Sequence, residues 1–81
     1  MSSTTRMARV TVSLKPGVLD PEGRAIQHAL HGLGFEQVND VRIGKVIELE
    51  VADGTTQAQL AEMAEKLLAN TVIENYEVTL P

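Results

Sequence analysis

Apolar and polar residues alternate strictly in three stretches of this chain, and no other feature limits its fold as much. The alternation runs through residues 8–14, 47–51 and 76–80. A period of two is typical of a strand with one buried face, because successive side chains point to opposite sides. We therefore expect a sheet with one polar face and one face packed against helices.

Two other stretches have the spacing of helices that are apolar on one side. Asp20 is expected to cap the first, with Pro21 at its first position and Gly34 as a left-handed end. Thr55 or Thr56 is expected to cap the second, with Asn70 as a left-handed exit. The expected buried positions are Ala25, Ile26, Ala29, Leu30 and Leu33 in the first helix and Leu60, Met63, Ala64, Leu67 and Leu68 in the second.

A further strand is expected over residues 38–43, where Val41 and Ile43 share one face. Gly44-Lys45 would then be the central pair of a tight hairpin. The order becomes βαββαβ, an α+β ferredoxin-like two-layer sandwich with a four-stranded antiparallel sheet and two helices on one face. Residues 1–7 are expected to be a flexible extension, and 8–81 a single domain.

The chain has 81 residues and no cysteine. A core of this size stabilises a domain by roughly 3–5 kcal/mol unless disulfides, a metal or self-association add to it. Without cysteine there is no disulfide, so we expect a homo-oligomer.

The amino-acid composition argues against two classes of partner, nucleic acids and membranes. The net charge is −4, only seven residues are basic, and the only aromatic residues are Phe35 and Tyr76. A nucleic-acid partner is not expected, because there is neither a basic stripe nor a stacking platform. No apolar run approaches the ~20 residues that span a bilayer, and no signal peptide is apparent, so we expect no membrane partner and a cytoplasmic location.

Candidate chemical groups have simpler interpretations. His28 and His31 share a helix face with Arg24, which would repel a cation. Three glutamates on the polar sheet face are interpreted as surface charges, not as a catalytic pair. We expect no catalytic, cofactor-binding or metal site in this chain. The carboxylates in question are Glu48, Glu50 and Glu77.

Several short motifs follow one another in a recognisable order. Val18-Leu19-Asp20-Pro21 follows the first strand, Val41-Arg42 and Gly44-Lys45 lie mid-chain, and Leu67-Leu68-Ala69-Asn70 precedes Val72-Ile73-Glu74. In this order and spacing the chain resembles the PurS family, the small subunits of phosphoribosylformylglycinamidine synthase. The resemblance covers residues 8–80.

This resemblance implies a non-catalytic subunit of a ligase in de novo purine biosynthesis. Such a subunit bridges the glutaminase subunit PurQ and the ATP-dependent synthetase subunit PurL, and assists ammonia transfer. It forms a dimer or tetramer and binds no cofactor itself, with ATP and Mg²⁺ expected in the synthetase. The family positions expected to contact partners are Asp20, Arg42, Gly44 and Lys45.

Two alternatives share the expected element order. One is an ACT-like regulatory module that binds a small molecule at a dimer seam. The other is a small hydrolase of the acylphosphatase type, which needs an anion-binding arginine after the first strand. That loop holds Lys15 and Asp20 instead.

Overall fold

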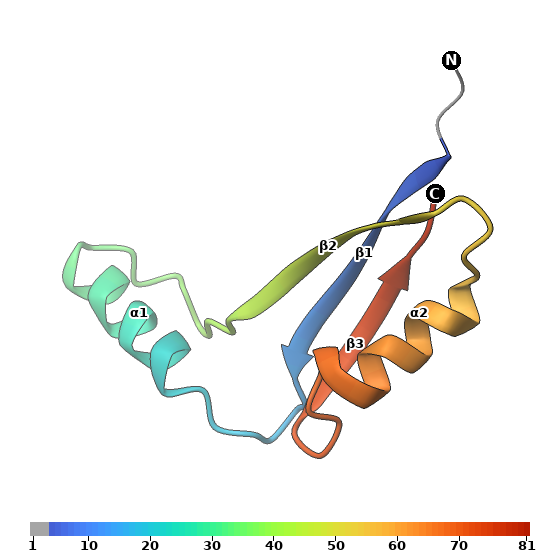
Figure 1. The fold of residues 1–81 in the computed structure, drawn as a ribbon. Coiled ribbons are helices and arrows are strands. Elements are labelled where there is room, and N and C mark those ends of the chain that lie inside the picture. Colours follow the sequence, from blue (N-terminus) through green and yellow to red (C-terminus); the bar gives the residue numbers. More distant parts are fainter. Residues whose placement is uncertain (1–3) are drawn as a thin grey trace.

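The computed structural model describes residues 4–81 (Figure 1). Three strands and two helical segments follow the order βαβαβ, and the second helix ends in a π-helical turn, η1. No helix within residues 4–81 is long and apolar enough to cross a membrane. The elements are β1 Thr5–Leu14, α1 Pro21–Gly32, β2 Gly44–Ala52, α2 Gln57–Met63, η1 Ala64–Leu68 and β3 Glu74–Thr79.

The sheet has the order β2-β1-β3, and β1 pairs antiparallel with both neighbours. Val10 lies opposite Ile47 on β2 and opposite Val78 on β3. The alternation in β1 is confirmed, because Ala8, Val10 and Val12 are fully buried. Since β1 is central, its inward side chains contact neighbours on both sides and form the middle of the core.

The second helical segment, α2 with η1, covers one face of this sheet (Figure 1). Thr56 caps it as predicted: its hydroxyl oxygen accepts from the Gln59 N–H, and its own N–H donates to Oε1 of Gln59. The buried positions then run Leu60, Ala64 and Ala69. The last interval is five residues, because the Ala69 N–H donates to the Ala64 carbonyl in the π-helical turn.

The predicted four-stranded sheet is wrong, since the sheet has three strands. Residues 38–43 are not a strand, and Gly44 and Lys45 begin β2 instead of turning a hairpin. The physical reason is that carboxylates bind the backbone donors there. The Val41 N–H donates to Asp40, and the Ile43 N–H donates to Asp20.

The prediction of two helices on one sheet face is also wrong. Only α2 lies over the sheet, whereas α1 projects away from it (Figure 1). The radius of gyration is 16.7 Å, against about 12 Å for a compact domain of this length. The ends of α1 are nevertheless as predicted, with Asp20 at the N-cap, Pro21 first and Gly34 left-handed at φ 98°.

Two smaller expectations concern the ends of elements. β1 begins at Thr5, so residues 5–7 pair with β2, while residues 1–3 of the expected extension lie outside the described part. Asn70 is not left-handed, since every positive φ in the described residues belongs to a glycine. Its side chain instead accepts from the Val72 N–H and closes the turn before β3.

Candidate interaction surfaces

The most unusual part of the molecule is residues 15–43, which we call the arm. It contains α1 and the segment that returns from α1 to β2 (Figure 1). Gln27 donates to the Asn39 carbonyl at 2.6 Å, and Nε2 of His31 lies 2.7 Å from the Val38 carbonyl. These bonds hold the returning segment along α1, so the arm is a unit of its own. His31, which was considered above with His28 as a ligand for a cation, makes one of these two contacts.

Asp20 joins the two chain segments at the base of the arm. Its Oδ1 accepts from the Gly23 N–H at 2.8 Å, which caps α1, and its Oδ2 accepts from the Ile43 N–H at 2.8 Å. The bonds from Ile43 and Gly23, with the charge of Arg42 nearby, lower the pKa of the buried Asp20 carboxyl below 3.8 despite its burial. Asp20 is therefore a structural anion of the arm.

Arg42 crosses the same base from the other side. Its guanidinium donates to the Val18 carbonyl at 2.9 Å and to the Lys15 carbonyl at 3.2 Å. The sequence had given Arg42 no structural role, but its side chain holds the incoming loop against the outgoing one.

Gly44 is required by the packing of the strands, whereas Lys45 is not. A Cβ on Gly44 would lie 2.7 Å from the Val12 carbonyl oxygen, so the pairing of β2 with β1 needs glycine there. Lys45 is exposed, and it forms no ion pair with any residue in 4–81. Together with Asp20 and Glu74, these two residues line one shallow hollow at the base of the arm.

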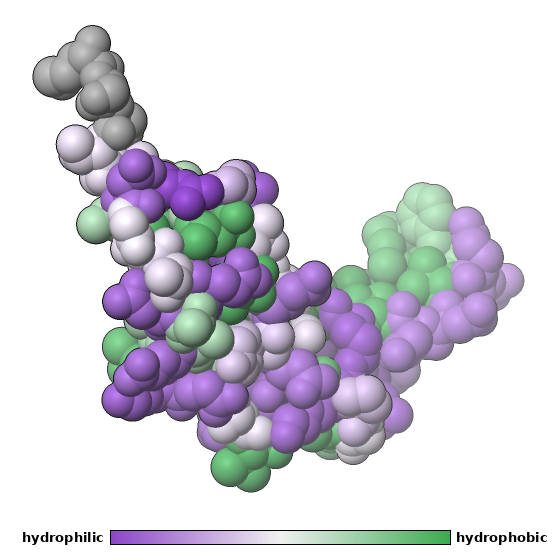
Figure 2. Space-filling model, turned by 90° about the vertical axis from the view of Figure 1, so that its right-hand side faces the viewer, coloured by the Kyte–Doolittle hydropathy of each residue, from purple (hydrophilic) through white to green (hydrophobic). Residues whose placement is uncertain are grey.

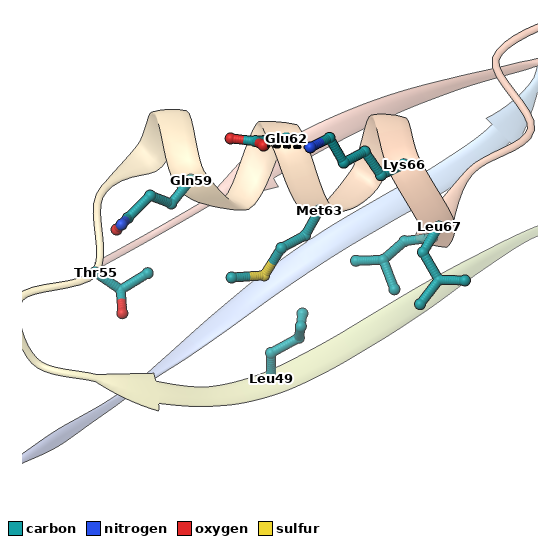
Figure 3. A pocket seen from close by; sticks show the side chains of 8 residues that line it. Leu49, Thr55, Gln59, Glu62, Met63, Lys66 and Leu67 are labelled. Carbon is teal, nitrogen blue, oxygen red and sulfur yellow. Dashed lines mark ion pairs between the residues drawn. The ribbon is translucent and has the colours of Figure 1, made fainter.

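A second surface is an apolar groove of about 570 Å³ between α2–η1 and β2. Figure 3 shows Met63 and Leu67 pointing from the helix toward Leu49 on β2. The Glu62–Lys66 ion pair, 2.7 Å long, lies along the outer rim. We call this the α2–β2 groove; its lining also includes Thr55, Gln59 and Leu68.

The groove lies beside the π-helical turn, which supplies Leu67 and Leu68 to its lining. Leu67 was predicted to be buried, but it is 83% exposed, and Met63 is 38% exposed. The extra residue in the turn brings Ala69 to the core in place of a position one residue earlier. Nothing in the apolar spacing of this segment distinguishes a π turn from a regular one, so the sequence could not place this surface.

The remaining polar side chains form local pairs. Glu48 on the outer sheet face binds Arg9 at 3.2 Å, in agreement with its interpretation as a surface charge. The Tyr76 hydroxyl donates to Glu65 at 3.0 Å. That hydrogen bond, with some burial and the carboxylate charge, raises the pKa of Tyr76 above 10. Sequence patterns alone did not indicate the Tyr76–Glu65 pair, because it joins β3 to η1.

The described residues therefore form three surface features: an arm held together by hydrogen bonds, an apolar groove, and a hollow with charged side chains in its lining. Within residues 4–81, no three His, Cys, Asp or Glu side chains are grouped to hold a metal ion. A fold and surfaces of this kind define a small interaction subunit.

Comparison with known proteins identifies the family. The model of the family described as "PurS: Phosphoribosylformylglycinamidine (FGAM) synthase" matches residues 7–81. The phosphoribosylformylglycinamidine synthase subunit PurS of Bacillus subtilis is 57% identical over 70 residues, which cover 84% of this chain and 83% of that protein. This chain belongs to the PurS family.

Solved structures agree with this assignment. PurS of Methanocaldococcus jannaschii has a TM-score of 0.80 and 42% identity, covering 93% of this chain and 94% of that one. A chain in the structure of PurLQS from Thermotoga maritima has a TM-score of 0.79 and 30% identity, covering 95% and 98%. The family assignment favours a synthase subunit over the ACT-like and acylphosphatase-like alternatives.

Proposed function

We propose that this chain is a non-catalytic subunit of phosphoribosylformylglycinamidine synthase in purine biosynthesis. In this role it bridges the glutaminase PurQ and the synthetase PurL and assists the transfer of ammonia between them. The observation that carries the proposal is the fold-level match along almost the whole chain to a protein in the PurLQS structure. The match of residues 7–81 to the synthase family supports it.

The shape of the chain suits a spacer between two larger proteins. Its longest dimension is 52 Å and its shortest is 14 Å, and the arm and the sheet layer present separate surfaces. A subunit of this form can hold a source and a consumer of ammonia in fixed register. Excluding water from the route between them keeps ammonia from being protonated or lost.

The proposed assembly contains more than one copy of this chain, as a dimer or tetramer. The small core of a single copy supports this, since Leu60, Val10 and Val12 are the only large side chains fully buried within residues 4–81. ATP and Mg²⁺ are assigned to the PurL subunit, and none to this chain. The cytoplasmic location stays a prediction.

The hollow at the base of the arm is the proposed contact with a synthase partner. Lys45 supplies a positive charge to a hollow that Glu22 and Glu74 also line, whereas Asp20, Arg42 and Gly44 act by holding the surface in place. A lysine without an ion-pair partner in residues 4–81 is available to a carboxylate of another protein.

The test is light-scattering chromatography of this chain, alone and with the cognate PurL and PurQ, with glutamine and nucleotide present. We expect an oligomer that joins both partners, and glutamine-dependent synthesis that requires this chain. An oligomer that ignores both partners under all conditions would contradict the proposal.

Lys45→Ala tests the contact surface. We expect assembly with the partners to weaken, with an unchanged melting temperature of the free subunit. The control is Arg9→Ala, which removes a cation already paired with Glu48 on the outer sheet face. If wild type and Lys45→Ala assemble with the partners to the same extent, Lys45 does not contribute to the interface.

A further inference from the structure

A hollow of about 470 Å³ lies within the arm, between the first half of α1 and the returning segment. We call it the arm hollow; it shares only Asp20 with the hollow that contains Lys45. Figure 2 shows that the arm carries a hydrophilic edge beside its hydrophobic part. Because most of the lining is charged or amide-bearing, the arm hollow suits a polar ligand. These side chains are Asp20, Arg24, Gln27, Asn39, Asp40 and Arg42.

Hydrogen bonds hold the walls of the arm hollow in place. Gln27 on α1 donates to the Asn39 carbonyl at 2.6 Å, which keeps the helix and the returning segment together. Arg42 donates to the Val18 carbonyl at 2.9 Å, which holds the loop before α1 against the same segment. The arm hollow is therefore formed by contacts of the chain itself, and a site that exists before its ligand arrives costs less to occupy.

Two of the four charges around the arm hollow are already engaged by the fold. Both oxygens of Asp20 accept backbone N–H groups. Two guanidinium nitrogens of Arg42 donate to backbone carbonyls. These two charges have opposite signs, so together they add no net charge to the arm hollow.

Arg24 and Asp40 are the charges that remain. They lie on different walls, Arg24 on α1 and Asp40 on the returning segment. Neither belongs to an ion pair within residues 4–81, so they do not neutralise each other across the space between them. Oδ1 of Asp40 accepts from the Val41 N–H at 2.9 Å, which orients the carboxylate and leaves its second oxygen available. A cation and an anion separated in this way are complementary to a ligand that carries both charges.

We propose that the arm hollow binds a free polar α-amino acid, with its carboxylate on Arg24 and its ammonium group on Asp40. A guanidinium offers two parallel N–H donors to a carboxylate, and a carboxylate accepts from an ammonium group. The amide side chains of Gln27 and Asn39 offer further hydrogen bonds to a polar side chain. The site goes beyond the proposed function, because one copy of the chain contains it and no synthase partner is needed to form it.

The probes are the standard free L-amino acids, each titrated into the isotope-labelled chain and followed by amide NMR. The charges are exposed, so we expect a dissociation constant on the order of 1 mM. At least one polar amino acid should shift the amide signals of Arg24, Asn39 and Asp40 in a saturable way. The amides of Thr11 and Glu77, on the outer sheet face, serve as internal controls and should stay unshifted. The absence of a saturable shift with every probe would overturn the inference.

Arg24→Gln and Asp40→Asn test the two charges separately. Each should raise the dissociation constant of the tightest-binding amino acid about fivefold, because each removes one exposed charge contact. The melting temperature of the free chain should not change, since Arg24 is exposed and an asparagine oxygen can still accept from the Val41 N–H. Arg9→Gln and Glu36→Gln are the matched controls, because both residues are exposed and lie outside the arm hollow. If the controls weaken binding as much as the test variants, the inference fails.

Derivatives of the same amino acid test which charge meets which residue. The carboxamide derivative has no carboxylate, so it should bind Arg24→Gln at least as well as wild type. The N-acetyl derivative has no ammonium group, so it should bind Asp40→Asn at least as well as wild type. A loss from Arg24→Gln that persists with the carboxamide derivative would contradict the assignment. Because these titrations use the chain without its partners, a chain that joins PurL and PurQ but binds no amino acid keeps the proposed function and loses the inference.

Discussion

Oδ2 of Asp20 accepts a hydrogen bond from the Ile43 N–H at 2.8 Å across 23 residues of sequence. The other carboxylate oxygen caps α1. One side chain thus fixes both where the helix starts and where the chain returns to the sheet. A local sequence motif predicts the helix cap, but it does not predict the hydrogen bond from the distant Ile43.

Asp20→Ala is expected to loosen the whole arm. Two buried or half-buried N–H groups lose their acceptor, so the melting temperature should fall by on the order of 5 °C. Hydrogen exchange should speed up at Gly23 and Ile43. Asp40→Ala is the control, because Asp40 is exposed and accepts only from its neighbour Val41. If both variants lower the melting temperature by a similar amount, the hydrogen bond from Ile43 to Asp20 does not contribute more to stability than a local one.

The same carboxylate predicts a pH dependence. Its pKa is lowered in the folded chain, so folding favours the charged form. The stability from this group is complete above its unfolded pKa, near 3.8, and is lost as pH falls through the lower folded value. The stability difference between wild type and Asp20→Asn, measured by urea unfolding, should be constant from about pH 5 to 7 and shrink below about pH 4. A difference that grows in acid would contradict the assignment.

Two glycines of α1 should respond in opposite ways to alanine. At Gly23 the added Cβ meets the Val41 carbonyl oxygen, so we expect a loss of at least about 1 kcal/mol. At Gly32 nothing lies within 4 Å of the added Cβ, and alanine should stabilise the helix by up to about 1 kcal/mol. Urea unfolding of both variants measures this, and a harmless Gly23→Ala would mean that α1 does not lie against Val41.

Tyr76 can be titrated directly by ultraviolet absorbance, because it is the only tyrosine and the chain has no tryptophan. Its midpoint should lie above 10, and Glu65→Gln should lower it toward the ordinary value. Since the folded pKa is raised, the stability from this pair is complete below about pH 10 and is lost as pH rises through the folded pKa. Glu77→Gln, on the exposed face of the same strand, serves as control. If the titration midpoint of Tyr76 in the wild type lies at the ordinary tyrosine value, the result contradicts the hydrogen bond to Glu65.

Sequence patterns were most informative where a local rule decides the structure. The alternation in β1, the caps at Asp20 and Thr56 and the turn at Gly34 each depend on neighbouring residues, and each is confirmed. Residues 38–43 have a strand-like pattern, but carboxylates bind two of their N–H groups. One of these, Asp20, is distant in sequence.

The position of α1 could not be predicted for a different reason. Its spacing indicates an apolar side that needs cover, and it contains no information about which surface supplies it. Leu67 was missed because one additional residue in a π turn rotates it out of the core. The partner-contact role of Lys45 stays a prediction, while Asp20, Arg42 and Gly44 have structural duties that the chain itself explains.

The central position of β1 has a consequence for biosynthesis. β1 is synthesised before both of the strands that pair with its edges, and the second of these, β3, ends at Thr79. Val10 and Val12 can pair with β2 once Ile47 and Lys45 have been synthesised, but the other edge of β1 stays open until β3 follows. The sheet is therefore complete only after β3 has been synthesised, and until then one edge of β1 presents unpaired backbone groups beside apolar side chains.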